Sequence, residues 1–204
     1  MIQLELIVEE ASAEEALRHL LPGMLRGRAR AKVINLGSKY KLLKVLEDRL
    51  RAYRTRIDKG ENLRVVVLLD RDDDDCVLLK DRLEQASAQA GLPSKSRPDE
   101  RGRFFVVNRI VIEELESWFI GDPEALRGAF TRLPRITPTS GIFRNPDNGG
   151  TWEALHRFLK KHGIYRNSYP KIDAARRIAP NMRIDRNRSR SFGQFVAGIE
   201  AMLA

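Results

Sequence analysis

The stretch from Arg64 to Asp75, RVVVLLDRDDDD, restricts the fold more than any other part of the chain. Its apolar run, Val65 to Leu69, ends abruptly in acid, which is typical of a strand buried on both faces of a parallel sheet. In open α/β sheets, ligands bind beyond the carboxyl ends of the strands, where Asp70 and Asp72 are expected. Closely spaced carboxylates repel one another unless a positive charge lies among them, which favours a divalent cation.

The next three acids of this run, Asp73, Asp74 and Asp75, have plainer interpretations. They suit a solvated loop, or the first turn of a following helix, where acids favour the helix dipole. A calcium-binding loop does not fit, because Asp75 replaces the glycine that its sharp turn requires and a strand precedes it.

Four segments with strand character alternate with helical segments. The expected strands are residues 2–8, 31–36, 65–69 and 104–112. Such alternation predicts an α/β fold: a Rossmann-like, mainly parallel four-stranded sheet, flanked by helices and joined by right-handed crossovers.

The helices between these strands have start and stop signals of their own. Ser12 and Glu15 are spaced as a capping box, and Pro22 is expected to interrupt or end that first helix. Ser38 is placed to cap a helix that runs to about residue 57. The third helix, 76–92, is expected to turn these residues inward: Val77, Leu78, Leu79, Leu83 and Ala86.

Acids also follow the first and the fourth strand. Glu9 and Glu10 end the first strand, and the segment EELESWFI begins at Glu113. On a helix, Glu113 and Glu116 would share a face, from which both would reach the metal edge. Glu113 fits equally well as an acid that serves a helix N-terminus, whereas Glu116 is the stronger candidate for function.

The charge of the chain is concentrated in one segment. The net charge is +9, and residues 156–190 hold eleven Lys or Arg against two acids, which leaves 26 basic and 26 acidic residues elsewhere. A localised basic patch is typical of a surface that binds nucleic acid, although a basic surface without a partner has the same composition. The candidates for holding phosphates are Lys171, Arg176, Arg177, Arg183 and Arg186.

Composition also divides the chain. Residues 133–150 are rich in Pro, Gly, Thr and Asn, which predicts a loop between an α/β domain, 1–132, and a basic helical extension, 151–204, packed on the same domain. Thr151 and Pro170 are expected to open helices of this extension. Phe192, at helical spacing, fits a core position or a platform on which bases stack.

No apolar stretch approaches the length of a membrane span, and the first residues are too acidic for a signal peptide. Cys76 is the only cysteine, so no disulfide forms within the chain. Both features favour a cytoplasmic location. The sequence leaves the oligomeric state open, a homo-oligomer included.

These residues resemble a known pattern. An apolar strand is followed by Glu9, and a later strand is followed by Asp70-Arg71-Asp72. Over about the first 120 residues, this pattern resembles the TOPRIM domain of topoisomerases, primases and OLD-type nucleases. Glu10 stands where that pattern has Gly. The segment 112–122 and the tail 169–195 look like small bacterial TOPRIM-like proteins of unassigned function, related to effectors of phage defence that work beside an ATPase.

The resemblance implies a metal-dependent nuclease that cleaves phosphodiester bonds in DNA or RNA. Asp70 and Asp72 would hold Mg²⁺ or Mn²⁺, Glu9 would act as general base or further ligand, and Glu116 would complete a second metal site. One alternative is a module that binds nucleic acid or regulates an ATPase without cutting. Another is an Asp-x-Asp phosphatase or glycosyltransferase, but the phosphatase motif belongs on the first strand, which lacks it.

Overall fold

The computed structural model describes residues 1–204 and contains one sheet of four parallel strands. The order across the sheet is β2-β1-β3-β4, so the two strands that end in Glu9 and Asp70 are neighbours. This confirms the predicted α/β class and the predicted parallel sheet. The strand bounds are β1 Ile2–Val8, β2 Ala29–Asn35, β3 Leu63–Asp70 and β4 Val106–Val111.

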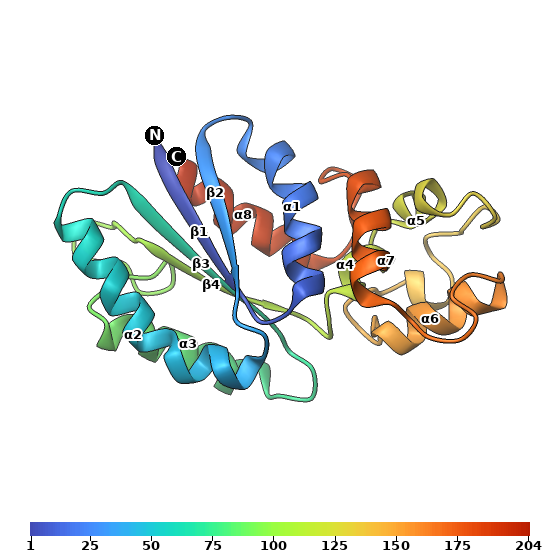
Figure 1. Cartoon of the computed structure of the whole chain (residues 1–204), viewed down its shortest axis with the longest axis horizontal. Helices are drawn as coiled ribbons and strands as arrows, with labels where there is room; N and C mark the ends of the chain where they lie inside the picture. The colour runs from blue at the N-terminus through green and yellow to red at the C-terminus, as the bar shows by residue number, and fades with distance from the viewer.

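Helices cover both faces of the sheet, so the sheet forms the middle layer between two layers of helices (Figure 1). On one face lie α2 (Lys39–Asp58) and α3 (Cys76–Gln89), and on the other lie α1 (Ala11–Leu25) and α8 (Arg190–Leu203). A lobe beside the sheet contains α4 Glu116–Ile120, α5 Pro123–Ala129, η1 Gly141–Phe143, α6 Trp152–Lys161, α7 Lys171–Ile178 and η2 Ala179–Asn181. No helix is both long and apolar enough to cross a membrane.

Alternate residues of the buried strands feed two separate cores. Leu4, Leu6 and Val66 belong to a core of 36 buried residues that continues through α1, the lobe and α8. Val65 and Val67 face the other way, into a core of 14 buried residues under α2 and α3. This alternation explains the continuous apolar runs Leu6–Val8 in β1 and Val65–Leu69 in β3, which are typical of parallel strands covered on both faces.

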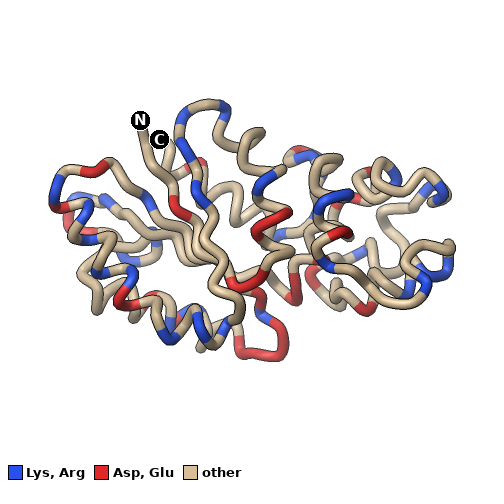
Figure 2. The backbone as a smooth tube through the Cα atoms, in the orientation of Figure 1, with Lys and Arg blue, Asp and Glu red and all other residues tan.

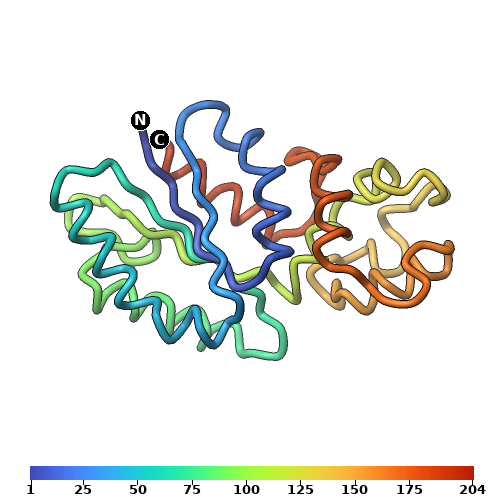
Figure 3. Tube along the Cα trace, in the orientation of Figure 1, coloured from blue at the N-terminus to red at the C-terminus, as the bar shows by residue number.

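The larger core contains residues from both sides of the loop 133–150. The chain leaves the sheet after β4, builds the lobe and returns with α8 to the sheet (Figure 3). Trp118 of α4 packs on Phe192 and Phe195 of α8, with ring centroids 5.1 and 5.0 Å apart. Phe192 is 1 % exposed, so it is a core residue and not a stacking platform.

Several predicted helix starts are confirmed by their caps. The side chain of Ser38 accepts a hydrogen bond from the Lys41 N–H, and the side chain of Thr151 accepts one from the Ala154 N–H. Pro170 stands directly before α7, as predicted. These short polar side chains satisfy backbone donors that a helix leaves unpaired in its first turn.

The prediction for the first helix is wrong at both ends. Glu10, not Ser12, is the residue before α1, and the Ser12 hydroxyl donates a hydrogen bond back to the Glu10 carboxylate. Pro22 lies inside α1, which continues to Leu25. Proline removes one helical hydrogen bond, but burial of Met24 and Leu25 in the larger core favours one further turn.

The inward face predicted for the third helix is also partly wrong. Val77 and Leu78 are 76 % and 72 % exposed, whereas Leu79 and Leu83 are buried. The helix cap sets which side chains face outward. The Asp75 carboxylate accepts hydrogen bonds from the N–H groups of residues 77 and 78, so the helix begins at Cys76 and the side chains of residues 77 and 78 point to solvent.

Candidate functional site

Two buried acids meet where β1 and β3 end. A Glu9 carboxylate oxygen accepts a hydrogen bond from the Asp70 N–H at 2.6 Å, and both residues are 7 % exposed. The contact follows from topology, because adjacent parallel strands bring their carboxyl ends to the same edge of the sheet. Sequence reasoning placed these two residues together, and the structure does so.

Burial makes both acids hard to ionise. Desolvation raises the pKa of Glu9 to about 7, although its hydrogen bond from Asp70 and the nearby Lys39 act in the opposite direction. Desolvation also raises the pKa of Asp70 well above its usual range, and the neighbouring Glu9 and Glu10 add to this effect. The Asp70 carboxylate accepts one hydrogen bond, at 3.3 Å, from the Leu115 N–H in the segment after β4. Such perturbed acids concentrate at functional sites.

Glu116, the first residue of α4, completes this buried cluster. It is fully buried, and neither of its carboxylate oxygens receives a hydrogen bond. Desolvation raises its pKa to about 7. The Tyr169 hydroxyl is buried beside it, and burial together with Glu116 raises the pKa of the tyrosine well above its usual range. A buried carboxylate without partners is costly, which makes Glu116 a candidate ligand for a cation.

A basic side chain from the lobe reaches the same acids. Lys171, the first residue of α7, lies 3.8 Å from the Glu10 carboxylate. Burial lowers the pKa of Lys171, but Glu116 and Glu10 outweigh this and the net shift is upward. The residue was predicted to hold phosphates; the structure places it at the acid cluster.

Asp72 lies apart from this cluster. It is exposed, its backbone has a φ of +49°, and its carboxylate pairs with the Lys39 ammonium at 2.7 Å. The same ammonium pairs with Asp74 at 2.8 Å, so it bridges two acids of the loop that hangs below the sheet in Figure 2. No sequence signal distinguishes Lys39 from the other basic residues along α2.

The oxygen donors suit Mg²⁺ or Mn²⁺, but they do not surround a common point. No group of three or more His, Cys, Asp or Glu side chains is arranged to hold a metal ion. One carboxylate oxygen of Glu9 accepts a hydrogen bond from the Asp70 N–H, and the Asp72 carboxylate is paired with the Lys39 ammonium. The unpartnered oxygens of Glu116 and the raised pKa values of the buried acids nevertheless fit a cation, because a positive charge would favour their ionised forms.

The predicted helix from Glu113 to Ile120 begins only at Glu116, so Glu113 and Glu116 do not share a helix face. Glu113 has a φ of +65° and pairs with the Arg71 guanidinium at 2.8 Å. Its carboxylate also accepts a hydrogen bond from the Gly149 N–H at 3.2 Å. Glu113 therefore fastens the loop after β3 to the loop before α6.

Most residues predicted to contact nucleic acid have partners within the protein. Arg176 pairs with Glu15 at 2.9 Å, Arg183 with Asp185 at 2.8 Å, and Arg186 with the fully buried Asp122 at 2.7 Å. Arg177 lies over the ring of Phe130, with 4.6 Å between its guanidinium carbon and the centroid. Of these four arginines, only Arg177 forms no ion pair.

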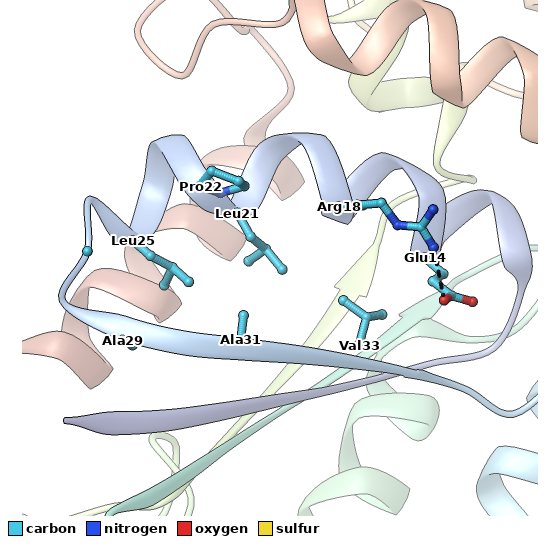
Figure 4. A pocket seen from close by; sticks show the side chains of 9 residues that line it. Glu14, Arg18, Leu21, Pro22, Leu25, Ala29, Ala31 and Val33 are labelled. Atoms are coloured by element: carbon cyan, nitrogen blue, oxygen red, sulfur yellow. Dashed lines mark hydrogen bonds and ion pairs between the residues drawn. The ribbon is translucent and has the colours of Figure 1, made fainter.

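A cavity of about 480 Å³ lies between α1 and β2, away from this chemistry (Figure 4). Its wall is mainly apolar, with Leu21 and Leu25 above and Ala31 and Val33 below. The only charged side chains that line it are Glu14 and Arg18, which pair with each other. It offers no cluster of acids or nucleophiles.

The comparison with protein families gives one match, over residues 8–200, to a domain of unknown function, DUF4276. The chain belongs to the DUF4276 family. Neither the curated proteins nor the solved structures contain a significant match. Membership in the DUF4276 family carries no activity with it, so function must be argued from the site.

Proposed function

We propose that this chain is a metal-dependent nuclease, of the TOPRIM type, that cleaves phosphodiester bonds in DNA or RNA. One observation carries the proposal: Glu9, Asp70 and Glu116, from three separate elements, are buried together at the carboxyl edge of a parallel sheet. A cluster of buried carboxyl groups opposes folding unless a cation or a proton neutralises it. A structural role alone does not account for the unpartnered oxygens of Glu116.

Each residue has a role in this proposal. Asp70 and Glu116, with Asp72 after it leaves Lys39, would hold Mg²⁺ or Mn²⁺. A divalent cation held there supplies Lewis-acid polarisation of a phosphoryl oxygen. Glu9, with a pKa of about 7, is suited to accept the proton of an attacking water at neutral pH. Lys171 contributes a fixed positive charge beside the acids, where a phosphate would bind.

The decisive test is a cleavage assay on labelled DNA and RNA, single- and double-stranded, in Mg²⁺, Mn²⁺ or EDTA. Asp70→Asn removes one charge from the buried cluster, and cleavage should fall by more than about 100-fold, because even outer-shell changes at metal sites cost 10- to 100-fold. Asp73→Asn is the matched control, since Asp73 is an exposed acid of the adjoining loop. Equal cleavage by both variants would contradict the proposal.

A second candidate is a non-catalytic module that binds nucleic acid or regulates a partner ATPase, as in phage defence. The observation in its favour is Lys39, whose ammonium already neutralises Asp72 and Asp74 without a metal. This candidate predicts salt-sensitive binding with no product in Mg²⁺ or Mn²⁺. The same assay separates the two functions when binding is measured beside cleavage.

A further inference from the structure

Two segments of the chain contain basic residues but no acidic ones, and their combined positive charge equals the net charge of the whole protein. Residues 125–146 contain four Lys or Arg, and residues 154–171 contain five, with no Asp or Glu in either segment. The rest of the chain has 28 basic and 28 acidic residues. These two segments, both of which belong to the lobe, therefore carry nine positive charges and no negative ones.

The fold brings the two segments side by side. A cavity of about 360 Å³ is lined by Phe130 and Arg132 from the first segment and by Gly163 and Tyr165 from the second. The rings of Phe130 and Tyr165 meet edge to face, with centroids 5.5 Å apart. Figure 2 shows basic positions on both segments at the end of the lobe that lies farthest from the sheet.

Four side chains form what we call the basic tip: Arg132, Lys160, Lys161 and Arg166. All four are exposed, and none of them forms an ion pair, unlike Arg176, Arg183 and Arg186. Arg166 folds back over the turn at Gly163, where an added Cβ would lie 3.4 Å from its guanidinium nitrogen. The tip thus presents four unpaired positive charges, of which Arg132 lines the cavity and Arg166 lies beside Gly163 in its wall.

We propose that the basic tip binds the phosphate backbone of a nucleic acid and anchors the substrate of the acid cluster. This inference rests on the proposed nuclease function and names where its substrate is held. Guanidinium and ammonium groups that release counterions from phosphates supply most sequence-independent affinity for nucleic acids. The large exposed hydrophobic residues of the protein all lie outside both segments, so the tip lacks the apolar anchor of a membrane-binding surface.

The test compares two variants with the same change in net charge. The tip variant carries Gln at all four tip positions. The control variant carries Gln at four exposed basic residues outside the lobe, none of which forms an ion pair: Arg30, Lys32, Lys44 and Lys59. Binding of labelled 20-nucleotide single strands and duplexes is measured by fluorescence anisotropy in EDTA, where no cleavage interferes, from 50 to 300 mM salt.

The tip variant should bind at least about tenfold more weakly at 100 mM salt, and its slope of log K against log salt should fall by about 3, because each lost phosphate contact contributes 0.7 to 0.9. The control should bind as the wild type does. Equal loss in both variants, or no loss in the tip variant, overturns the proposal. So does a tip variant that loses only its binding to vesicles of anionic phospholipid.

Binding in EDTA separates this inference from the nuclease function. If the wild type binds through the tip but never cleaves in Mg²⁺ or Mn²⁺, the nuclease proposal fails and the tip remains a nucleic-acid site. If the wild type cleaves in a manner that needs Asp70 but the tip variant binds and cleaves normally, the nuclease stands and the tip proposal fails.

Discussion

Substitution of Glu116 by Gln should change how the stability of the protein depends on pH. The carboxyl group is fully buried, and its pKa is about 7 in the folded protein against an ordinary value of 4.5. Between these values the folded state holds a proton that the unfolded state has lost, so stability falls as pH rises through this window. The difference corresponds to about 3 kcal/mol at pH 8, relative to pH 4.

Burial causes most of this effect, and charged groups from several elements modify it. Lys171 favours the ionised form, whereas Glu114 and Glu10 oppose it. Gln carries no charge, so the Glu116→Gln variant should lose this part of the pH dependence, whatever constant cost its amide adds. For a chain of this size, about 3 kcal/mol corresponds to a shift of roughly 6 to 12 °C in Tm.

The measurement is urea unfolding at pH 5, 6, 7 and 8 in EDTA. The wild type should lose stability across this range more steeply than Glu116→Gln. Glu100→Gln, which changes an exposed carboxylate, should follow the wild type. Adding Mg²⁺ or Mn²⁺ at pH 8 should stabilise the wild type more than Glu116→Gln, because a cation binds the ionised carboxylates. Equal pH slopes in the wild type and in Glu116→Gln would show that Glu116 does not hold this proton in the folded protein.

Four further substitutions test other parts of the structure. Arg186→Ala should destabilise the protein by about 3 to 5 kcal/mol in urea unfolding, because the buried Asp122 carboxylate would lose its positively charged partner. A loss of stability below about 1 kcal/mol would contradict the importance of this ion pair. Gly150→Ala should cost about 1 to 3 kcal/mol, since its methyl group meets a backbone carbonyl oxygen, whereas Gly23→Ala, in open space on α1, should stabilise slightly. Lys39→Gln should tighten Mn²⁺ binding, measured by calorimetry, because it frees two loop acids; weaker binding would show that Lys39 supports the site.

The sheet and most helix starts follow from local signals in the sequence. Val65 to Leu69 has the pattern of a strand covered on both faces, and Ser38 and Thr151 cap helices as their positions indicate. Pro22 shows the limit of such signals, because tertiary packing of the residues after it outweighs the hydrogen bond that proline removes.

The candidate site was predictable only where topology fixes it. Glu9 and Asp70 end neighbouring strands, so their meeting follows from the sheet order. Asp72 and Lys39 pair although they lie 33 positions apart in the sequence, and no motif indicates this pairing. Likewise, Arg186 reads as surface charge in the sequence, and only the fold reveals the buried acid that it neutralises.

The contact between α4 and α8 also affects the order in which the fold is completed during synthesis. Trp118, two residues after Glu116, is held by Phe192 and Phe195, which lie in the last helix of the chain. A chain that is still being translated lacks these aromatic partners, so Trp118 cannot yet be packed as it is in the folded protein. The segment that carries Glu116 therefore reaches its final position only after residues 192 and 195 have been synthesised and have packed against α4.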